Sequence, residues 1–274
     1  MTESIVNRKG ASKPSLIPDQ VLSLLHTGEI ESVNLTEWLA VDHVSLLKHV
    51  LPNVNLQSYL QDVLPEVEQG NNNSGMKAIR IIGQKLQEIL HTMNESEYSS
   101  TFHSLATHPS DSVRCWSAYI IGLNPTLSID EKLAQIKRFA ADPHFGVREI
   151  AWMAVRESMA NELSASLLIL QDWVKENDAN VRRFATESIR PRGVWCKHID
   201  LLKQEPELAL PLLEQVKSDP AKYVQDSVGN WLNDASKSQP EWVVQICQQW
   251  AETSNTKETK RIITKAQRTL IQKG

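Results

Sequence analysis

The chain has 274 residues, of which 41% are hydrophobic and 23% charged, so it has enough apolar mass for a sizeable core and is not disordered throughout. Its formal net charge of −4 counts against a surface coated in positive charge for nucleic acid, but does not exclude a local basic stripe. Only 10 glycines and 12 prolines are present, which disfavours a protein of many strands and tight turns.

Hydropathy and cysteine usage indicate the compartment. No run of apolar residues is long enough to span a membrane, and residues 1–18 lack the apolar core of a secretion signal. Cys115, Cys196 and Cys247 are odd in number, far apart and without a CxxC pair, so neither a disulfide framework nor a zinc cluster is expected. We therefore expect a cytoplasmic monomer that contacts no membrane and needs no metal or cofactor.

The first hundred residues predict an irregular helical cap. Residues 1–15 have the composition of a flexible arm, with three basic side chains (Arg8, Lys9 and Lys13) opposed only by Glu3. Amphipathic runs predict helices in the segments that follow, and a polar stretch at 69–75 predicts a loop. These helices are expected at 18–27, 35–49, 56–68 and 75–91.

The remaining chain contains an internal repeat. Four segments align on Val113, Val147, Val181 and Val224, which are separated by 34, 34 and 43 residues, and a proline stands four residues before the valine in three of them. Each valine opens a helical pattern, and each segment follows another amphipathic run, most clearly at 129–141 and 163–176. Tetratricopeptide repeats have a similar period, but their Trp-Leu-Gly-Tyr pattern is absent, which leaves chance similarity within a helical bundle as the other alternative.

The repeat unit is therefore a helix, a short polar loop and a second helix, as in HEAT-like repeats. We predict an all-α protein whose residues 16–274 form a single α-solenoid domain with an irregular N-terminal helical cap. The second helices of such a solenoid line its concave face, and positions two, six and nine after each valine share one side of the helix. These positions are predicted to form a mixed acidic and basic binding groove: Cys115, Tyr119 and Gly122; Glu149, Met153 and Arg156; Arg183, Glu187 and Arg190; Asp226, Asn230 and Asn233.

The longest interval between repeats carries a basic cluster. Pro191 should end the preceding helix, because it disfavours α conformation at residue 190 and has no N–H to donate. Between residues 181 and 197 five basic residues face one acid, Glu187, with Trp195 among them. Arginines bind phosphates bidentately and stack on bases, so the cluster could hold a DNA backbone. The alternative is structural: Arg182 would cap the inter-repeat loop and the other side chains would be solvated.

At these residues the sequence resembles the HEAT-like-repeat DNA glycosylases that remove alkylated bases, the AlkC/AlkD superfamily, and AlkC more closely. The resemblance is specific at Val181-Arg-Arg-Phe-Ala-Thr-Glu-Ser-Ile-Arg-Pro-Arg-Gly-Val-Trp195 and at Asp219-Pro-Ala-Lys-Tyr-Val-Gln-Asp-Ser-Val-Gly-Asn-Trp-Leu-Asn-Asp234. It implies a monofunctional DNA repair enzyme that hydrolyses the N-glycosidic bond of cationic alkylated bases, such as 3-methyladenine, in double-stranded DNA. The solenoid itself implies no chemistry, so the alternative function is a non-catalytic scaffold that binds DNA structures or a protein partner.

The resemblance also implies roles for individual residues. Carboxylates can stabilise the positive charge that develops on the sugar and can position a water, which suggests Glu187 and Asp234 as catalytic residues. The sequence departs from the family at Ser188, where a glycine is expected, and at Trp152, where a carboxylate is expected. Glu187 could instead form an intrahelical ion pair, and Asp234 could cap a helix or loop. The predicted lesion contacts are Trp152, Trp195, Glu149 and Asn230, and the predicted DNA-binding residues are Arg148, Arg156, Arg182, Arg183, Arg190, Arg192 and Lys197.

Overall fold

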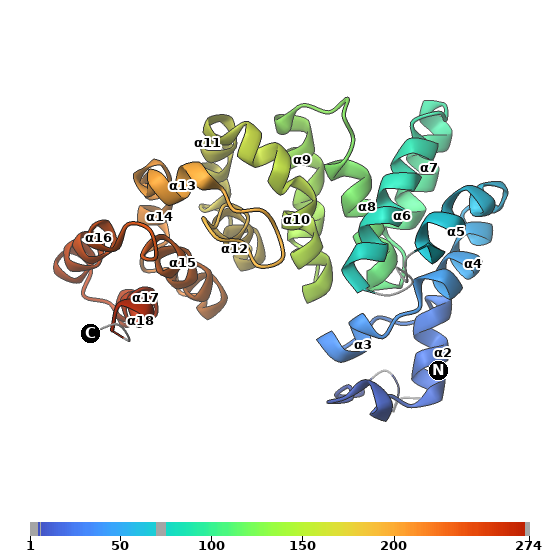
Figure 1. The fold of residues 1–274 in the computed structure, drawn as a ribbon, viewed down its shortest axis with the longest axis horizontal. Coiled ribbons are helices and arrows are strands. Elements are labelled where there is room, and N and C mark those ends of the chain that lie inside the picture. The colour runs from blue at the N-terminus through green and yellow to red at the C-terminus, as the bar shows by residue number, and fades with distance from the viewer. Residues whose placement is uncertain (1–4, 6, 70–74, 272–274) are drawn as a thin grey trace. The chain divides into compact units, whose positions relative to one another are not determined.

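The computed structural model describes residues 5, 7–69 and 75–271, and the elements in this part of the chain are helices (Figure 1), which confirms the predicted fold class. Residues 1–4 and 6 of the expected arm and residues 70–74 of the expected polar loop lie outside the described residues. In chain order the elements are η1 (Pro14–Leu16), α2 (Asp19–Thr27), α3 (Leu35–Leu39), α4 (His43–Asn53), η2 (Gln57–Tyr59), α5 (Leu60–Glu68), α6 (Gly75–Leu90), α7 (Glu95–Ala106), α8 (Asp111–Gly122), α9 (Ile129–Ala140), α10 (Phe145–Asn161), α11 (Leu163–Trp173), α12 (Ala179–Glu187), α13 (Asp200–Gln204), η3 (Pro206–Ala209), α14 (Leu210–Gln215), α15 (Lys222–Ala235), α16 (Pro240–Thr253), α17 (Lys257–Ala266) and α18 (Arg268–Ile271).

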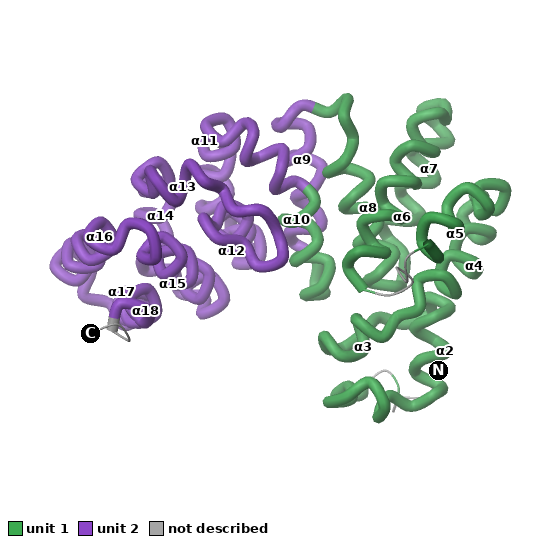
Figure 2. The backbone as a smooth tube through the Cα atoms, viewed as in Figure 1, with its two compact units in different colours: residues 1–127, 142–154 green, residues 128–141, 155–274 purple. Residues whose placement is uncertain are grey.

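The chain divides into two compact units (Figure 2). Unit 1 comprises Met1–Leu127 and Asp142–Ala154, and unit 2 comprises Ser128–Ala141 and Val155–Gly274. Helix α10 therefore contributes its first part to unit 1 and its remainder to unit 2. The organisation of residues 16–274 as a single solenoid domain stays a prediction.

The repeated valines mark the second helix of each pair. Helices α8, α10, α12 and α15 each begin two residues before their valine, and all four valines are buried. The helix before each loop is also present, and α9 begins with a capping box in which the Ser128 hydroxyl and the Glu131 carboxylate satisfy free backbone N–H groups. The repeat predicted from sequence is thus confirmed as a pair of helices joined by a short loop.

The arginine that follows the valine joins successive repeat loops. In unit 1, Arg114 donates to carbonyls of its own loop and pairs with Asp142 of the next loop, at 2.9 Å between Nε and Oδ2. In unit 2, Arg182 does the same with Asp219, at 2.7 Å. The fourth repeat has Gln225 at this position, whose amide donates to the carbonyl of Asp219 in its own loop and accepts from Arg261 of α17. The Asp-Pro-x-x-x-Val-Arg signature is therefore explained by loop-to-loop pairing.

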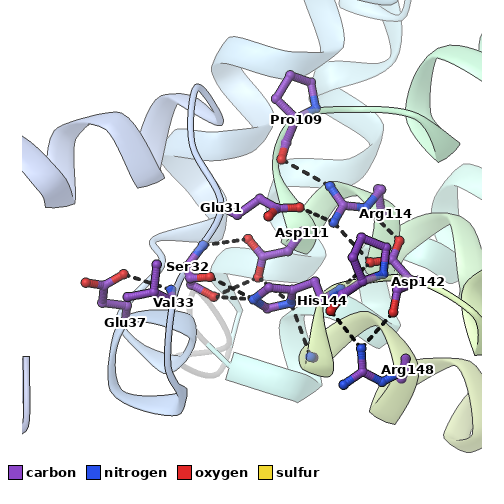
Figure 3. Close-up of polar contacts among 12 residues, drawn as sticks. Glu31, Ser32, Val33, Glu37, Pro109, Asp111, Arg114, Asp142, His144 and Arg148 are labelled. Carbon is purple, nitrogen blue, oxygen red and sulfur yellow. Dashed lines mark hydrogen bonds and ion pairs between the residues drawn. The ribbon is translucent and has the colours of Figure 1, made fainter. Parts of the chain in front are cut away.

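A buried polar cluster fixes the segment between α2 and α3 to α8 and the start of α10 (Figure 3). Ser32 donates to Asp111 through its backbone N–H and its hydroxyl, at 3.0 and 2.9 Å. Nε2 of His144 lies 2.8 Å from the Ser32 carbonyl, to which it donates, while its Nδ1 accepts from Gly146 N–H. Because every polar group of Ser32 is satisfied inside unit 1, this segment is held firmly despite having no regular structure.

Two expectations for the N-terminal cap need correction. The arm expected to be flexible over residues 1–15 is anchored at Arg8, which forms an ion pair of 2.7 Å with buried Glu37, and at Ala11, whose carbonyl accepts from Asn34. The single helix expected over 35–49 is two helices, α3 and α4. It is interrupted because Asp42 caps α4 by accepting from the backbone N–H of Val44 at 3.0 Å.

Candidate functional site

The loop that follows α12 is built around the buried guanidinium of Arg156. Only 3% of Arg156 is exposed, and its nitrogens donate to the carbonyls of Ser188, Arg190 and Lys197 at 2.7, 2.6 and 3.1 Å. Because these carbonyls stand near both ends of residues 188–197, one side chain from α10 closes the loop. Arg156 therefore fixes loop geometry, and its role in DNA binding stays a prediction.

The loop presents an exposed tryptophan at its tip. Trp195 is 68% exposed and has a φ of 59°, in the left-handed region that non-glycine residues rarely adopt. The adjacent Val194 is also exposed. Gly193 makes this conformation accessible, since a Cβ there would stand 2.1 Å from the sulfur of Cys196 and 3.0 Å from Cζ of Arg156. A large aromatic ring held outward by unfavourable backbone geometry is typical of a recognition site.

The two predicted catalytic carboxylates lie on either side of one arginine in unit 2. Arg190 donates to Glu187 Oε1 at 2.8 Å, and it reaches Asp234 Oδ2 through Nε at 2.9 Å and Nη2 at 2.7 Å. All three side chains are buried. The structure thus brings Glu187 and Asp234 together across 47 positions of sequence, as an ion-pair network with Arg190 at its centre. The intrahelical pairing considered for Glu187 is also present.

The surroundings of Glu187 keep it ionised. Burial would raise the pKa of Glu187, but the charges of Arg183 and Arg190 and the hydroxyl of Ser227 outweigh this effect, so the pKa lies below its usual value. Ser227 donates to Oε2 at 2.7 Å, while Arg183 also stacks over the ring of Tyr223 at 4.7 Å. Ser227 and Tyr223 belong to the 219–234 motif but had no role assigned from sequence.

Asp234 is as buried as Glu187, but one of its two oxygens is held by a weaker contact. Its second oxygen, Oδ1, accepts from Lys237 at 3.2 Å, a longer contact than either bond from Arg190. The Lys237 side chain is exposed, so it can move away without disturbing the core. Of the two carboxylates, Asp234 therefore has the oxygen that is easier to release toward a substrate or a water.

The predicted groove-lining positions after Val181 and Val224 are contacted by neighbouring helices. In α12 and the residues just after it, positions two, six and nine contact α15, through the pairs Arg183–Tyr223, Glu187–Ser227 and Arg190–Asp234. In α15 the same positions are contacted by α17 and α18: Asp226 pairs with Arg261 and Lys265, Asn230 accepts from Arg268, and Asn233 donates to Thr269. Asn230 is half-buried and engaged by Arg268, and its role as a lesion contact stays a prediction.

The remaining predicted DNA-binding residues divide into structural and exposed groups. Arg148 donates to the carbonyls of Asp142 and Pro143 in its own loop, and Arg182 joins two loops, so both have a structural role. Arg183 and Arg190 are buried in the carboxylate network. Arg192 donates to Ser238 at 2.7 Å, whereas Lys197 is exposed and has only a 3.7 Å ion pair with Glu157.

Glu149 and Trp152 lie together in unit 1. The indole N–H of Trp152 donates to Glu149 Oε2 at 2.8 Å, and the Trp152 side chain is buried. The carboxylate expected near position 152 is thus replaced by a tryptophan that is hydrogen-bonded to an acid one turn earlier. Their role as lesion contacts stays a prediction.

Other clusters do not have the geometry of an active site. Ser32, His144 and Asp111 have the residue types of a nucleophilic triad, but the Ser32 hydroxyl donates to Asp111 itself and is buried. Burial raises the pKa of the Cys196 thiol despite the nearby Arg156 and Arg190, so it is a poor nucleophile. Over residues 5, 7–69 and 75–271, no group of three or more His, Cys, Asp and Glu side chains is arranged for a metal ion. In the same ranges no helix has the length and hydropathy needed to traverse a bilayer.

The residues described above in unit 2 lie within the part of the chain that matches a known protein family. Residues 147–266 match the model of a family described as DNA alkylation repair enzyme. The uncharacterized protein YhaZ of Bacillus subtilis is 39% identical over 121 residues, which cover 44% of this chain and 33% of that protein. The chain thus spans about a third of the length of this curated relative.

Two solved structures share the fold. AlkC of Pseudomonas fluorescens, an alkylpurine DNA glycosylase bound to DNA containing an abasic-site analogue, has a TM-score of 0.67 and 23% identity, with 83% of this chain and 60% of that chain covered. AlkD2 of Streptococcus mutans has a TM-score of 0.57 and 22% identity, with coverage of 76% and 97%. The resemblance to the AlkC/AlkD superfamily is thus confirmed: residues 147–266 match the DNA alkylation repair enzymes, and the chain has the helical-repeat fold of AlkC and AlkD.

Proposed function

We propose that the chain is a DNA repair glycosylase that hydrolyses the N-glycosidic bond of cationic alkylated bases in double-stranded DNA. The observation that carries this proposal is the exposed Trp195 on the loop that follows α12. The same loop begins at the network of Glu187 and Arg190 with Asp234 of α15, and all four residues lie inside the matched range 147–266. An exposed aromatic ring can stack on a base or on a cationic lesion, and Lys197 beside it can pair with a phosphate.

The chemistry requires little from the enzyme at the base, because an alkylated base that carries positive charge is already a good leaving group. The sugar acquires oxocarbenium character, which negative groups stabilise, and a water must approach the anomeric carbon. We assign water positioning and charge stabilisation to Asp234 Oδ1, after Lys237 has moved to a phosphate or to solvent. Glu187 would act with it by orienting Arg190 and by adding negative charge to the network. Base release in this scheme is monofunctional, with no covalent intermediate on the protein.

Measured release of 3-methyladenine from methylated duplex under single turnover tests the proposal. Asp234→Asn should lower release by about two to three orders of magnitude, the usual effect of losing one preorganised electrostatic group, and Glu187→Gln should lower it as well. DNA binding should persist in both, and thermal unfolding should establish that each variant is folded. Glu252→Gln is the matched control, because Glu252 is an exposed acid on α16 of the same unit.

A specific observation favours a second candidate function, a scaffold that binds DNA without cleaving it. Glu187 and Asp234 are both neutralised by arginine, and paired carboxylates stabilise a cation less than free ones. Absence of base release by the unmodified chain, together with retained duplex binding, would establish this alternative.

A further inference from the structure

Unit 1 contains a cavity of about 320 Å³ that the proposed function does not use. It lies where the C-terminal ends of α6 and α8 meet the N-terminal end of α7, three helices that are neighbours in Figure 1. Its lining residues are Gln87, Leu90, His91, Met93, Glu95, Tyr98, Ile120 and Asn124. The volume and the mixture of apolar side chains with a few polar groups are typical of a small-ligand site.

An unsatisfied carboxamide is the first indication of a ligand. Gln87 is only 7% exposed, and its side chain has no hydrogen-bond partner among the described residues. Its amide atoms are not among the polar atoms sealed from solvent, so they are reachable from the cavity that the residue lines. A buried amide without protein partners is costly unless water or a ligand satisfies it. A glutamine amide offers a donor and an acceptor side by side, which match the N6 and N7 atoms of an adenine ring.

The other walls suit a planar ring. Leu90 and Ile120 are fully buried and apolar. Tyr98 stacks on Phe102 with ring centroids 5.8 Å apart and planes within 3°, and burial raises the pKa of Tyr98, so it stays a neutral phenol. Asn124 uses Oδ1 to accept from Thr126, which leaves its Nδ2 as a further donor without a described partner.

The charges around the cavity favour a cation. Glu95 is exposed and is the acid in the lining, which contains neither lysine nor arginine. The C-terminal ends of α6 and α8 direct the negative ends of two helix dipoles toward this region, against one positive end from the N-terminus of α7. An aromatic ring such as that of Tyr98 attracts a cationic heterocycle through its face.

We propose that this cavity binds a cationic N-alkylated adenine as a free nucleoside, with Gln87 on the N6/N7 edge, Tyr98 against the ring and Glu95 near the charge. The inference concerns binding of a free small molecule to unit 1 and does not require the chain to cleave DNA. It therefore stands or fails separately from the proposed glycosylase activity.

Calorimetric titration of the full chain with 1-methyladenosine, adenosine and 7-methylguanosine in mildly acidic buffer tests this site. The first ligand keeps both the N6/N7 edge and the charge, the second keeps the edge without the charge, and the third keeps the charge with N7 blocked. We expect 1-methyladenosine to bind at least about tenfold more tightly than either of the others, the usual effect of losing a hydrogen bond or a charge in such a site.

Three variants assign the interaction. Gln87→Met should weaken 1-methyladenosine binding about tenfold, while Gln84→Met, an exposed glutamine of the same helix, should leave it unchanged. Glu95→Gln, at an exposed position where misfolding is not expected, should remove the preference for 1-methyladenosine over adenosine. No binding by the unmodified chain, equal binding of all three nucleosides, or unchanged binding in Gln87→Met would overturn the proposal. Base release from DNA should be the same in Gln87→Met as in the unmodified chain, because Gln87 lies outside the proposed catalytic residues.

Discussion

Replacement of Arg156 by glutamine tests whether its hydrogen bonds to backbone carbonyls hold the loop that carries Trp195. The unmodified guanidinium donates to three carbonyls, two of which belong to the buried residues Ser188 and Arg190. Glutamine has two N–H donors on a shorter side chain, so it can replace at most one of these bonds without moving the backbone. The carbonyl of Lys197 can turn to water because Lys197 itself is exposed.

The magnitude follows from the buried carbonyls that lose a partner. A hydrogen bond from a charged group contributes about 1.5 to 3 kcal/mol, and two such bonds give at most about 6 kcal/mol. Burial lowers the pKa of Arg156, which means that burying its charge has a cost that the variant no longer bears. We therefore expect Arg156→Gln to lower the free energy of unfolding by about 3 kcal/mol.

Two measurements separate loss of stability from loss of loop order. Urea unfolding followed by circular dichroism gives the free energy, and acrylamide quenching of tryptophan fluorescence reports on Trp195, the most exposed indole among the residues described. Arg138→Gln, which changes an exposed arginine on α9 of the same unit, is the matched control. An Arg156→Gln variant within about 0.5 kcal/mol of the unmodified chain, with unchanged quenching, would refute the argument that this side chain holds the loop.

Two further predictions follow from backbone geometry and from a buried histidine. Because Trp195 has a φ of 59°, the free energy of unfolding of Trp195→Gly should be about 1 kcal/mol higher than that of Trp195→Ala. Both variants should lose affinity for alkylated duplex. Equal stability of the two would contradict the left-handed conformation. Burial lowers the pKa of His43 to about 4 from 6.5, so the unfolded state takes up a proton first and the unfolding free energy should fall by up to about 3 kcal/mol as the pH decreases through this range. In His43→Leu this part of the pH dependence should disappear from denaturant titrations, and a profile identical to that of the unmodified chain would show that other groups cause it.

The helices could be predicted from sequence because their determinants are local. The period of 3.6 residues and the recurring valines gave the second helices of the repeats, and the predicted start of each was within two residues of the observed one. The break in the 35–49 segment was missed because one side chain, Asp42, caps a new helix inside an otherwise continuous apolar pattern.

For Arg182 the structural alternative considered from sequence, capping of the inter-repeat loop, is the one observed. The roles of the other arginines could not be predicted, because their partners are distant in sequence. Arg190 meets Asp234, which is 44 positions away, and Arg156 meets carbonyls of a loop that begins 32 positions later. From sequence alone, such an arginine is predicted to bind phosphate, because only the structure shows which carboxylate or carbonyl it pairs with. The partners of the groove-lining positions could not be predicted for the same reason, since α17 was not recognised from sequence as the helix that packs on α15.

The pairing between successive loops has a consequence for how the chain acquires its structure during synthesis. Arg114 and Asp142 are 28 positions apart, and Arg182 and Asp219 are 37 apart. Each of these arginines therefore meets its counter-ion as soon as the next loop has left the ribosome, before the C-terminal part of the polypeptide has been made. Contacts of such short range favour fast, stepwise growth of ordered structure from the N-terminal side. The arrangement suits co-translational folding, in which each newly made loop completes the unit before it.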